Sequence, residues 1–160
     1  MDADFESPFM SKMSFLAYRK LREVVDKHDI PIDAPRIVFV GETSTGKSML
    51  VQNFLGFPCT FSQAGVATRC PVAYQLRYNP DVPEYRVIKP SGITPQMLAG
   101  RLRDHMKNIE QESKFSKDPY EIELESSFYP DLEILDVPGL IAGNESEDRD
   151  AVEKSKLLQL

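Results

Sequence analysis

The sequence predicts an α/β fold in which a sheet lies between layers of helices. Two observations predict it. An apolar run without alternation, residues 36–40, is followed by a glycine-rich stretch and then by apolar residues at helical spacing. Further along, segments of strand character flank a polar segment of helical character at residues 94–113. A short, fully apolar strand is typical of a sheet covered on both faces, so the sequence favours a three-layer sandwich.

The N-terminal segment is predicted to form a helix over residues 8–28, because Ser7 and Pro8 are favourable at a helix start. Mostly apolar residues recur along one predicted face: Met10, Met13, Leu16, Ala17, Leu21, Val24, Val25 and His28. Two interpretations of this face stay open, packing on its own domain or an amphipathic stripe for a membrane or a partner helix. We divide the chain into this helix with its linker, residues 1–33, and a larger domain, residues 34–160.

The segment at 36–40 is predicted to be a strand buried on both faces, which places it centrally in the sheet. The helix that follows the glycine-rich stretch is expected to end at Gly56. After a loop at 57–71, strands are predicted at 72–78 and 85–88, separated by a turn that contains proline.

The second half of the chain continues the alternation of helix and strand. The charged residues of the helix at 94–113, Glu110 among them, are assigned to a solvated face. Alternating apolar and acidic residues predict strands at 120–125 and 132–136, which we expect to form an antiparallel hairpin at the sheet edge. A last helical pattern covers residues 151–158.

The composition is that of an ordinary globular domain. Apolar residues make up 41% and charged residues 28% of the 160 residues, which suits one compact core. The formal net charge of −6 argues against a protein that binds nucleic acid over its whole surface, although a sum of charges leaves a local basic patch open. No nucleic acid partner is expected.

The cellular setting is predicted from cysteines and hydropathy. Because Cys59 and Cys70 are the only cysteines, a disulfide framework is not expected and a cytoplasmic setting is favoured. The acidic start resembles neither a secretory signal nor a transit peptide. No run approaches the ~18 apolar residues that span a bilayer, so membrane contact is expected to be peripheral or to use parts outside this sequence.

One segment matches the phosphate-binding pattern G-x-x-x-x-G-K-[ST] without a gap. It consists of Gly41, Glu42, Thr43, Ser44, Thr45, Gly46, Lys47 and Ser48, and Met49 follows in the helix. Its backbone N–H groups and the helix N-terminus favour phosphate oxygens. Lys47 is expected to reach the β- and γ-phosphates of a nucleotide, and the Ser48 hydroxyl to bind Mg²⁺. The alternative is an ordinary glycine-rich turn with a solvated lysine, which does not explain the position between a buried strand and a helix.

A second motif, Asp136-Val137-Pro138-Gly139, follows the last predicted strand. An Asp at the end of an apolar strand can orient the water shell of a metal ion. Gly139 can bring its N–H against a γ-phosphate where a side chain would clash. Asp136 on its own would more often be a turn residue, so its assignment to a metal site depends on the phosphate-binding loop earlier in the chain.

Between these motifs, the segment at 65–71 offers the hydroxyl of Thr68, about twenty residues after Ser48. Such a threonine can close over Mg²⁺ and a γ-phosphate, as switch loops do. Spacing alone leaves a surface threonine equally plausible.

Three phrases, GETSTGKSMLVQNFLG, GVATRCPV and YPDLEILDVPGL, resemble the dynamin family of large GTPases in their order and approximate spacing. The resemblance extends over about residues 30–145. It implies a P-loop NTPase fold of the G-domain type, GTP as the substrate and Mg²⁺ as the cofactor. It also implies self-association across the GTPase face and membrane remodelling or fission by the full-length protein. The helix at 8–28 resembles the family's leading helix, which packs in a small bundle beside the GTPase domain.

The resemblance assigns roles to individual residues as well. Thr68 would bind Mg²⁺ and position the attacking water, Gly139 would serve the second switch, and Ser44 would help to hold a monovalent cation, K⁺ or Na⁺. The family commonly has Gln before that serine and a small residue before the Gln, whereas this chain has Thr43 and Glu42. Thr43 is shorter than Gln, so either turnover is slow or the water is held differently.

The guanine-reading motif of the family, Thr/Asn-Lys-x-Asp, is absent after Gly139, and Ser116-Lys117-Asp118-Pro119 is a poor imitation of it. Guanine specificity therefore rests on the resemblance, and the predicted G-domain is incomplete. A strand beside residues 37–40 is also expected to be missing, so the 160-residue chain should expose a strand edge and aggregate. By itself it is expected to bind GTP weakly and to hydrolyse it slowly or not at all.

Two alternatives to an efficient GTPase stay open. One is a switch module that binds nucleotide without turning it over, which Thr43 favours. The other is a P-loop ATPase or kinase, which would not be expected to combine Asp-x-Pro-Gly with the Thr-Arg-x-Pro segment.

Overall fold

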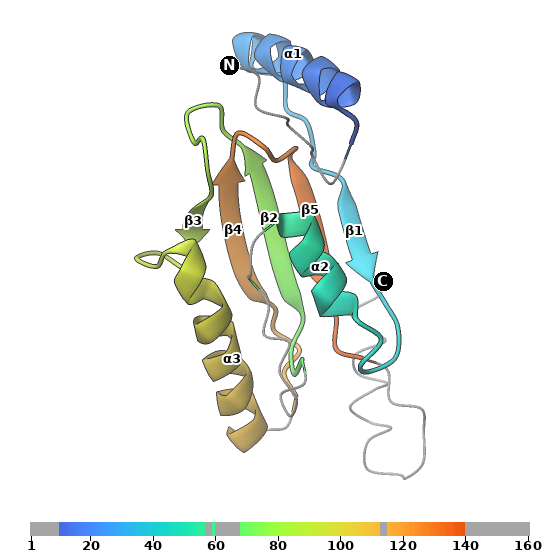
Figure 1. The fold of residues 1–160 in the computed structure, drawn as a ribbon, viewed down its shortest axis with the longest axis vertical. Helices are drawn as coiled ribbons and strands as arrows, with labels where there is room; N and C mark the ends of the chain where they lie inside the picture. The colour runs from blue at the N-terminus through green and yellow to red at the C-terminus, as the bar shows by residue number, and fades with distance from the viewer. Residues whose placement is uncertain (1–9, 57–58, 60–67, 113–114, 140–160) are drawn as a thin grey trace.

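The computed structural model describes residues 10–56, 59, 68–112 and 115–139, and Figure 1 shows how they are arranged. The helices are α1 (Lys12–His28), α2 (Lys47–Leu55) and α3 (Pro95–Glu112). The strands are β1 (Arg36–Phe39), β2 (Val72–Tyr78), β3 (Arg86–Lys89), β4 (Tyr120–Ser126) and β5 (Leu132–Asp136). The α/β class is confirmed, and the predicted strands lie within one residue of the observed bounds. The helix predicted at 151–158 lies outside the described residues.

The five strands form one sheet in the order β1-β5-β2-β4-β3. The pairs β1–β5 and β2–β4 are parallel, and the pairs β2–β5 and β3–β4 are antiparallel. The predicted hairpin of the last two strands is therefore wrong, because β2 lies between them. Cross-strand charges favour the observed order: Glu123 of β4 lies 3.6 Å from Arg77 of β2, and Glu133 of β5 lies 2.9 Å from Arg36 of β1. A hairpin would instead have set the acidic rows of β4 and β5 side by side.

The hydrophobic core lies on one face of the sheet, under α2 and α3 (Figure 1). Alternate strand residues point into it, among them Tyr74, Ile122 and Ile134, which are fully buried. The opposite face carries ion pairs, which include Arg86 with Glu125 as well as the two pairs described above. The described residues thus form two layers of the expected three-layer, incomplete G-domain.

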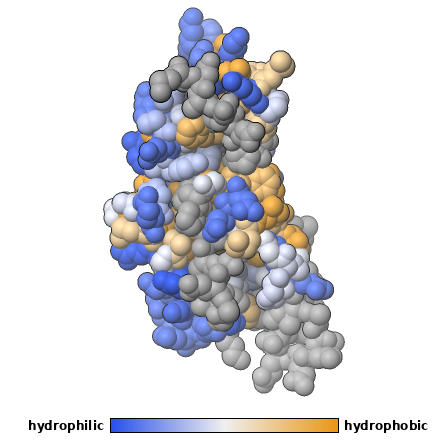
Figure 2. Space-filling view, viewed as in Figure 1, coloured by the Kyte–Doolittle hydropathy of each residue, from blue (hydrophilic) through white to orange (hydrophobic). Residues whose placement is uncertain are grey.

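β1 is an edge strand, not the central strand that its apolar sequence predicts. Within the described residues it pairs only with β5, so Ile37 and Val38 are 41% and 43% exposed. Figure 2 shows apolar residues gathered on the side of the molecule where β1 and α2 lie. The expected exposure of an apolar strand edge is therefore observed, and such an edge can pair with another chain.

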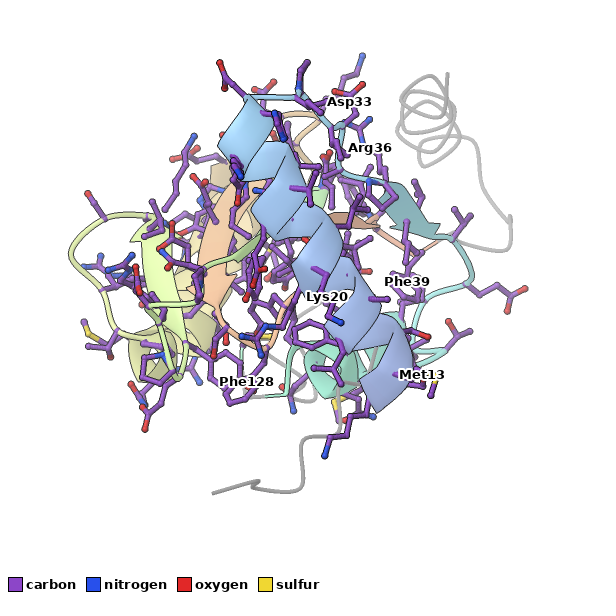
Figure 3. All side chains as sticks on the ribbon, turned by 90° about the horizontal axis from the view of Figure 1, so that it is seen from above. Met13, Lys20, Asp33, Arg36, Phe39 and Phe128 are labelled. Atoms are coloured by element: carbon purple, nitrogen blue, oxygen red, sulfur yellow. The ribbon has the colours of Figure 1, made fainter. Side chains whose placement is uncertain are left out.

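α1 begins later than predicted. Its N-cap is Ser11, whose hydroxyl accepts the Ser14 N–H at 3.2 Å, and residues 7–9 lie outside the described part of the chain. The helix ends where Asp29 adopts a left-handed conformation with φ of 51°. Figure 3 looks onto α1 and shows it lying across one end of the sheet, and Figure 1 shows that the glycine-rich loop lies at the other end.

A cluster of hydrogen bonds attaches α1 to the sheet. The Tyr18 hydroxyl donates to the Asp131 carboxylate at 2.9 Å and accepts the Asp131 N–H at 2.8 Å. The other carboxylate oxygen accepts the Tyr78 N–H at 2.9 Å. Arg22 Nε lies 3.2 Å from the carboxylate, within ion-pair distance but without hydrogen-bond alignment. Burial raises the pKa of Tyr18 well above its ordinary value, so its hydroxyl remains a proton donor.

The predicted apolar face of α1 is mostly its outward face, so most of it does not pack on the described part of the chain. Met13 is 82% exposed, and Leu16, Leu21 and Val24 are also exposed. The docked face buries Val25, which belongs to the predicted apolar face, and Phe15, which does not, and it uses the polar tip of Tyr18. Aromatic rings with hydrogen-bonding partners outweigh the larger number of aliphatic residues, because Asp131 and Tyr78 offer polar groups that need partners. No helix in the described ranges is both long and apolar enough to cross a bilayer.

We expect Tyr18→Phe to destabilise the docking of α1 while leaving the ring packing in place. The substitution removes two hydrogen bonds and leaves the Asp131 N–H without its acceptor, so the cost should be about 1–3 kcal/mol. Chemical unfolding and amide exchange of α1 measure this change. Tyr120→Phe is the matched control, since within the described residues its hydroxyl makes no hydrogen bond; equal effects of the two variants would contradict the docking role.

Candidate functional site

The glycine-rich loop between β1 and α2 wraps around the ammonium group of Lys47. Lys47 Nζ donates to the carbonyl oxygens of Gly41 at 3.0 Å and Glu42 at 2.7 Å. The Thr45 hydroxyl donates to the same Glu42 carbonyl at 2.8 Å. A lysine has three N–H donors, so one remains beyond these two bonds to meet an anion.

The loop leads into α2 through two left-handed residues, Ser44 with φ of 63° and Gly46 with φ of 88°. The first backbone bond of the helix runs from the Leu50 N–H to the Gly46 carbonyl at 2.9 Å. The N–H groups of Lys47, Ser48 and Met49 precede it, so they have no acceptor within the helix. Together with the helix dipole, these N–H groups form an anion-binding arrangement. Met49 can therefore contribute through its backbone, while its side chain is 40% exposed.

Asp136 joins this loop from the end of β5. Its carboxylate is buried, with 2% exposure of the residue, and its Oδ2 accepts the Ser48 hydroxyl at 2.6 Å. Within the described residues its Oδ1 is buried without a hydrogen-bond partner. Desolvation raises the pKa of Asp136, and the Ser48 hydrogen bond and the charge of Lys47 oppose that rise only in part. A carboxylate oxygen that is buried without a hydrogen-bond partner is unfavourable, and none of the described residues supplies that partner.

The donor set at this point suits Mg²⁺. A carboxylate oxygen and a hydroxyl oxygen are hard ligands, and Mg²⁺ in nucleotide sites is commonly held by one or two protein oxygens together with phosphates. No cluster of three or more His, Cys, Asp or Glu side chains that could hold a metal ion occurs in the described part of the chain. Ser48 and Asp136 therefore fit the predicted cation, and Asp136 supplies its unpaired oxygen.

Gly139 lies directly against the phosphate-binding loop. A Cβ atom at this position would come within 2.5 Å of the Thr43 Cα and 2.6 Å of the Thr43 N. No real Cβ approaches a backbone this closely, so the position requires glycine or a displaced loop. The two motifs of the sequence thus meet in space, with Thr43 at their contact.

Thr68 lies toward the same end of the sheet as Asp136, four residues before the start of β2. Val72, four residues later, pairs with Asp136 across the antiparallel β2–β5 ladder. Four residues span at most about 14 Å, so Thr68 lies near the metal-site end of the sheet. Among the described residues its hydroxyl makes no hydrogen bond to Ser48 or Asp136. The rest of the switch phrase, residues 65–67, lies outside the described part.

One pair near Thr68 was not foreseen from the sequence. Glu110 was expected only to be solvated; it is exposed, but it also bonds to Arg69, the residue after Thr68, at 2.6 Å. The two positions are 41 residues apart, so no local pattern could have linked them. The only signal was the presence of a basic residue in the switch phrase and acidic residues on the helix at 94–113.

Asp136→Asn should stabilise the nucleotide-free protein at neutral pH and abolish Mg²⁺-dependent nucleotide binding. The pKa of Asp136 is raised in the folded chain, so folding favours its protonated form. Its contribution to the free energy of unfolding is therefore fully present below the ordinary carboxyl pKa and is lost as the pH rises through the raised value. Asn stays neutral and can keep the Ser48 hydrogen bond, so Tm at neutral pH should increase by about 2 °C or more.

Thermal unfolding between pH 4 and pH 8, together with binding of a fluorescent nucleotide with and without Mg²⁺, tests this expectation. Asp104→Asn on the exposed surface of α3 is the matched control and should change neither quantity. An Asp136→Asn protein that still binds nucleotide in a Mg²⁺-dependent manner would remove Asp136 from the metal site.

The chain is similar in sequence to known proteins. The sequence pattern of the dynamin family matches residues 37–158, well over half of the chain. Dynamin-like protein ARC5 of Arabidopsis thaliana is 29% identical over 137 residues, which cover 79% of this chain and 18% of that protein. The mitochondrial dynamin-like GTPase MGM1 of Saccharomyces cerevisiae is 26% identical over 151 residues, which cover 89% of this chain and 17% of that protein.

A third relative, Dynamin-A of Dictyostelium discoideum, is 26% identical over 121 residues, with 69% of this chain and 14% of that protein covered. The chain thus spans less than a fifth of the length of each of these relatives. The matched region contains both the phosphate-binding loop and the Asp136–Gly139 motif, which the structure brings together. The chain therefore belongs to the dynamin family and contains part of its GTPase domain.

Proposed function

We propose that this chain provides the phosphate-binding and metal-binding part of a GTP-hydrolysing site. The observation that carries the proposal is the 2.6 Å bond from Ser48 to Asp136, which joins the loop to β5 and leaves Asp136 Oδ1 without a described partner. Lys47 and the N–H groups at the start of α2 bind the β- and γ-phosphates, and Ser48 and Asp136 hold Mg²⁺. When bound, Mg²⁺ neutralises charge that develops on the phosphates.

Other residues complete the proposed site. Gly139 presents its N–H to the γ-phosphate, at a position where its close approach to Thr43 tolerates no side chain. Ser44, held in a left-handed conformation, contributes to a site for K⁺ or Na⁺, and Thr68 closes over Mg²⁺ and positions the attacking water. Gly41, Glu42, Thr45, Gly46 and Met49 serve as the nucleotide-binding backbone.

The role of the whole protein is also a proposal. Family membership supports self-association across the GTPase face and membrane remodelling or fission, with peripheral membrane contact through parts outside this chain. A cytoplasmic location is supported by the two cysteines, Cys59 and Cys70, which are both free thiols. The outward apolar residues of α1, among them Met13, Leu16 and Val24, support a bundle-like role for the segment at 1–33, beside a GTPase domain at 34–160.

A switch module that binds GTP without efficient hydrolysis is the second candidate. Thr43 favours it, because a threonine stands where the family commonly has a longer Gln and lies packed against Gly139. Phosphate release by the full-length protein in the presence and absence of excess K⁺ separates the two candidates. An enzyme should accelerate with K⁺, whereas a binding module should release phosphate at a low, unchanged rate.

Lys47→Ala in the full-length protein should weaken guanine-nucleotide binding and abolish turnover, because the ammonium group organises the loop and meets the phosphates. Loss of one such charged contact should cost at least about tenfold in affinity. Lys20→Ala, on the outward side of α1, is the matched control. Unchanged affinity and turnover in Lys47→Ala would refute the proposal.

Competition between labelled GTP and unlabelled ATP tests whether the site is specific for guanine over adenine. ATP should fail to displace GTP from the full-length protein, and equal displacement would favour a P-loop ATPase or kinase.

The isolated 160-residue chain is expected to bind GTP weakly and to turn it over slowly or not at all. Robust turnover by this chain would contradict that expectation.

A further inference from the structure

Arg69 directly follows the proposed switch threonine, and its backbone N–H, its backbone carbonyl and one guanidinium nitrogen each contact α3 or the segment after α3. Its N–H lies 3.2 Å from Sδ of Met106, and its carbonyl accepts the Ser116 N–H at 2.8 Å. Its guanidinium donates to Glu110 at 2.6 Å and lies 5.1 Å from the centre of the Phe115 ring. An arginine held through backbone and side chain at once has little freedom left.

These contacts act on Thr68 through a single peptide group. The Thr68 carbonyl and the Arg69 N–H belong to the same planar peptide, so the contact with Met106 also sets the direction of the Thr68 carbonyl. Met106 itself is fully buried and also lies 3.9 Å from the Cys70 sulfur. The anchor is therefore part of the core, whereas Thr68 is only half-buried.

The strands on both sides of β2 supply the second constraint on the segment. Val72 pairs with Asp136, and Tyr120 donates its N–H to the Pro71 carbonyl at 2.8 Å. The three residues between Thr68 and Val72 are thus held on one side by α3 and on the other by the sheet that carries the metal-site carboxylate. Thr68 stands at the point where this fixed segment begins.

We propose that Glu110 and Met106 of α3 are positioning residues for the reaction, acting through Arg69 on Thr68. The proposal rests on the proposed GTPase function and adds α3 to the parts that determine its rate. An ion pair and a sulfur contact outside the proposed nucleotide site hold Thr68 close to the position that it takes in the reaction. The entropic cost of ordering Thr68 when nucleotide binds is therefore smaller. Neither Glu110 nor Met106 is placed to touch the nucleotide.

Glu110→Gln in the full-length protein tests the ion pair, because Gln keeps the size of the side chain and removes its charge. We expect kcat for GTP to fall about three- to tenfold while the affinity for fluorescent GDP and the Tm stay unchanged. Hydrogen–deuterium exchange of the peptide that covers residues 68–71 should become faster in the nucleotide-free protein. Glu112→Gln, two residues further along the same helix, is the matched control and should change none of these quantities.

Two further variants make the test specific. Met106→Leu keeps the buried volume and removes the sulfur acceptor, so it should also accelerate exchange at 68–71. The charge swap Arg69→Glu with Glu110→Arg should restore slow exchange and most of kcat if the ion pair is the cause.

Unchanged exchange and kcat in Glu110→Gln would overturn the proposal. Equal losses of kcat, GDP affinity and Tm would also overturn it, because they would show that Glu110 has a merely structural role. Failure of the wild-type protein to bind or hydrolyse GTP would instead overturn the proposed function, while exchange would still report on the anchor.

Discussion

The hydrogen bond between Ser48 and Asp136 is the constraint on which the site depends. It joins two residues 88 positions apart, one at the start of α2 and the other at the end of β5. A carboxylate this deeply buried needs partners, and Ser48 supplies one to Oδ2 while Oδ1 has none in the described residues. The same bond holds the phosphate-binding loop at the sheet, so Gly139 can lie directly on the backbone of Thr43.

β5 is the element through which the structure is organised. It pairs with β1 on one side and with β2 on the other, and its buried residues contribute to the core. Asp131, immediately before this strand, holds α1 through Tyr18, and Asp136 closes the strand at the nucleotide site. The five-residue strand β5 thus extends from α1 at one end of the sheet to the glycine-rich loop at the other, as Figure 1 shows.

Local sequence was a good guide where the relevant interactions are local. The phosphate-binding loop, the strands at 72–78 and 132–136 and the helix at 94–113 were recognisable because dihedral preference and periodicity act over a few residues. The hairpin of the last two strands was wrongly predicted, and the sequence left open which face of α1 packs on the sheet. Both depend on partners distant in sequence: β2 inserted between the strands, and Asp131 as the acceptor for Tyr18.

The sequence by itself determined which groups we propose to bind phosphate and metal, since Lys47, Ser48, Asp136 and Gly139 each belong to motifs whose chemistry is set by residue type and spacing. Only the tertiary structure decided that these groups converge, that Asp136 Oδ1 is buried without a partner among the described residues, and that Glu110 bonds to Arg69 beside Thr68. The reason is that short-range preferences restrict each backbone segment separately. Strand order and the burial of polar groups depend on packing and hydrogen bonds between segments that are distant in sequence, so they follow from the free energy of the complete fold.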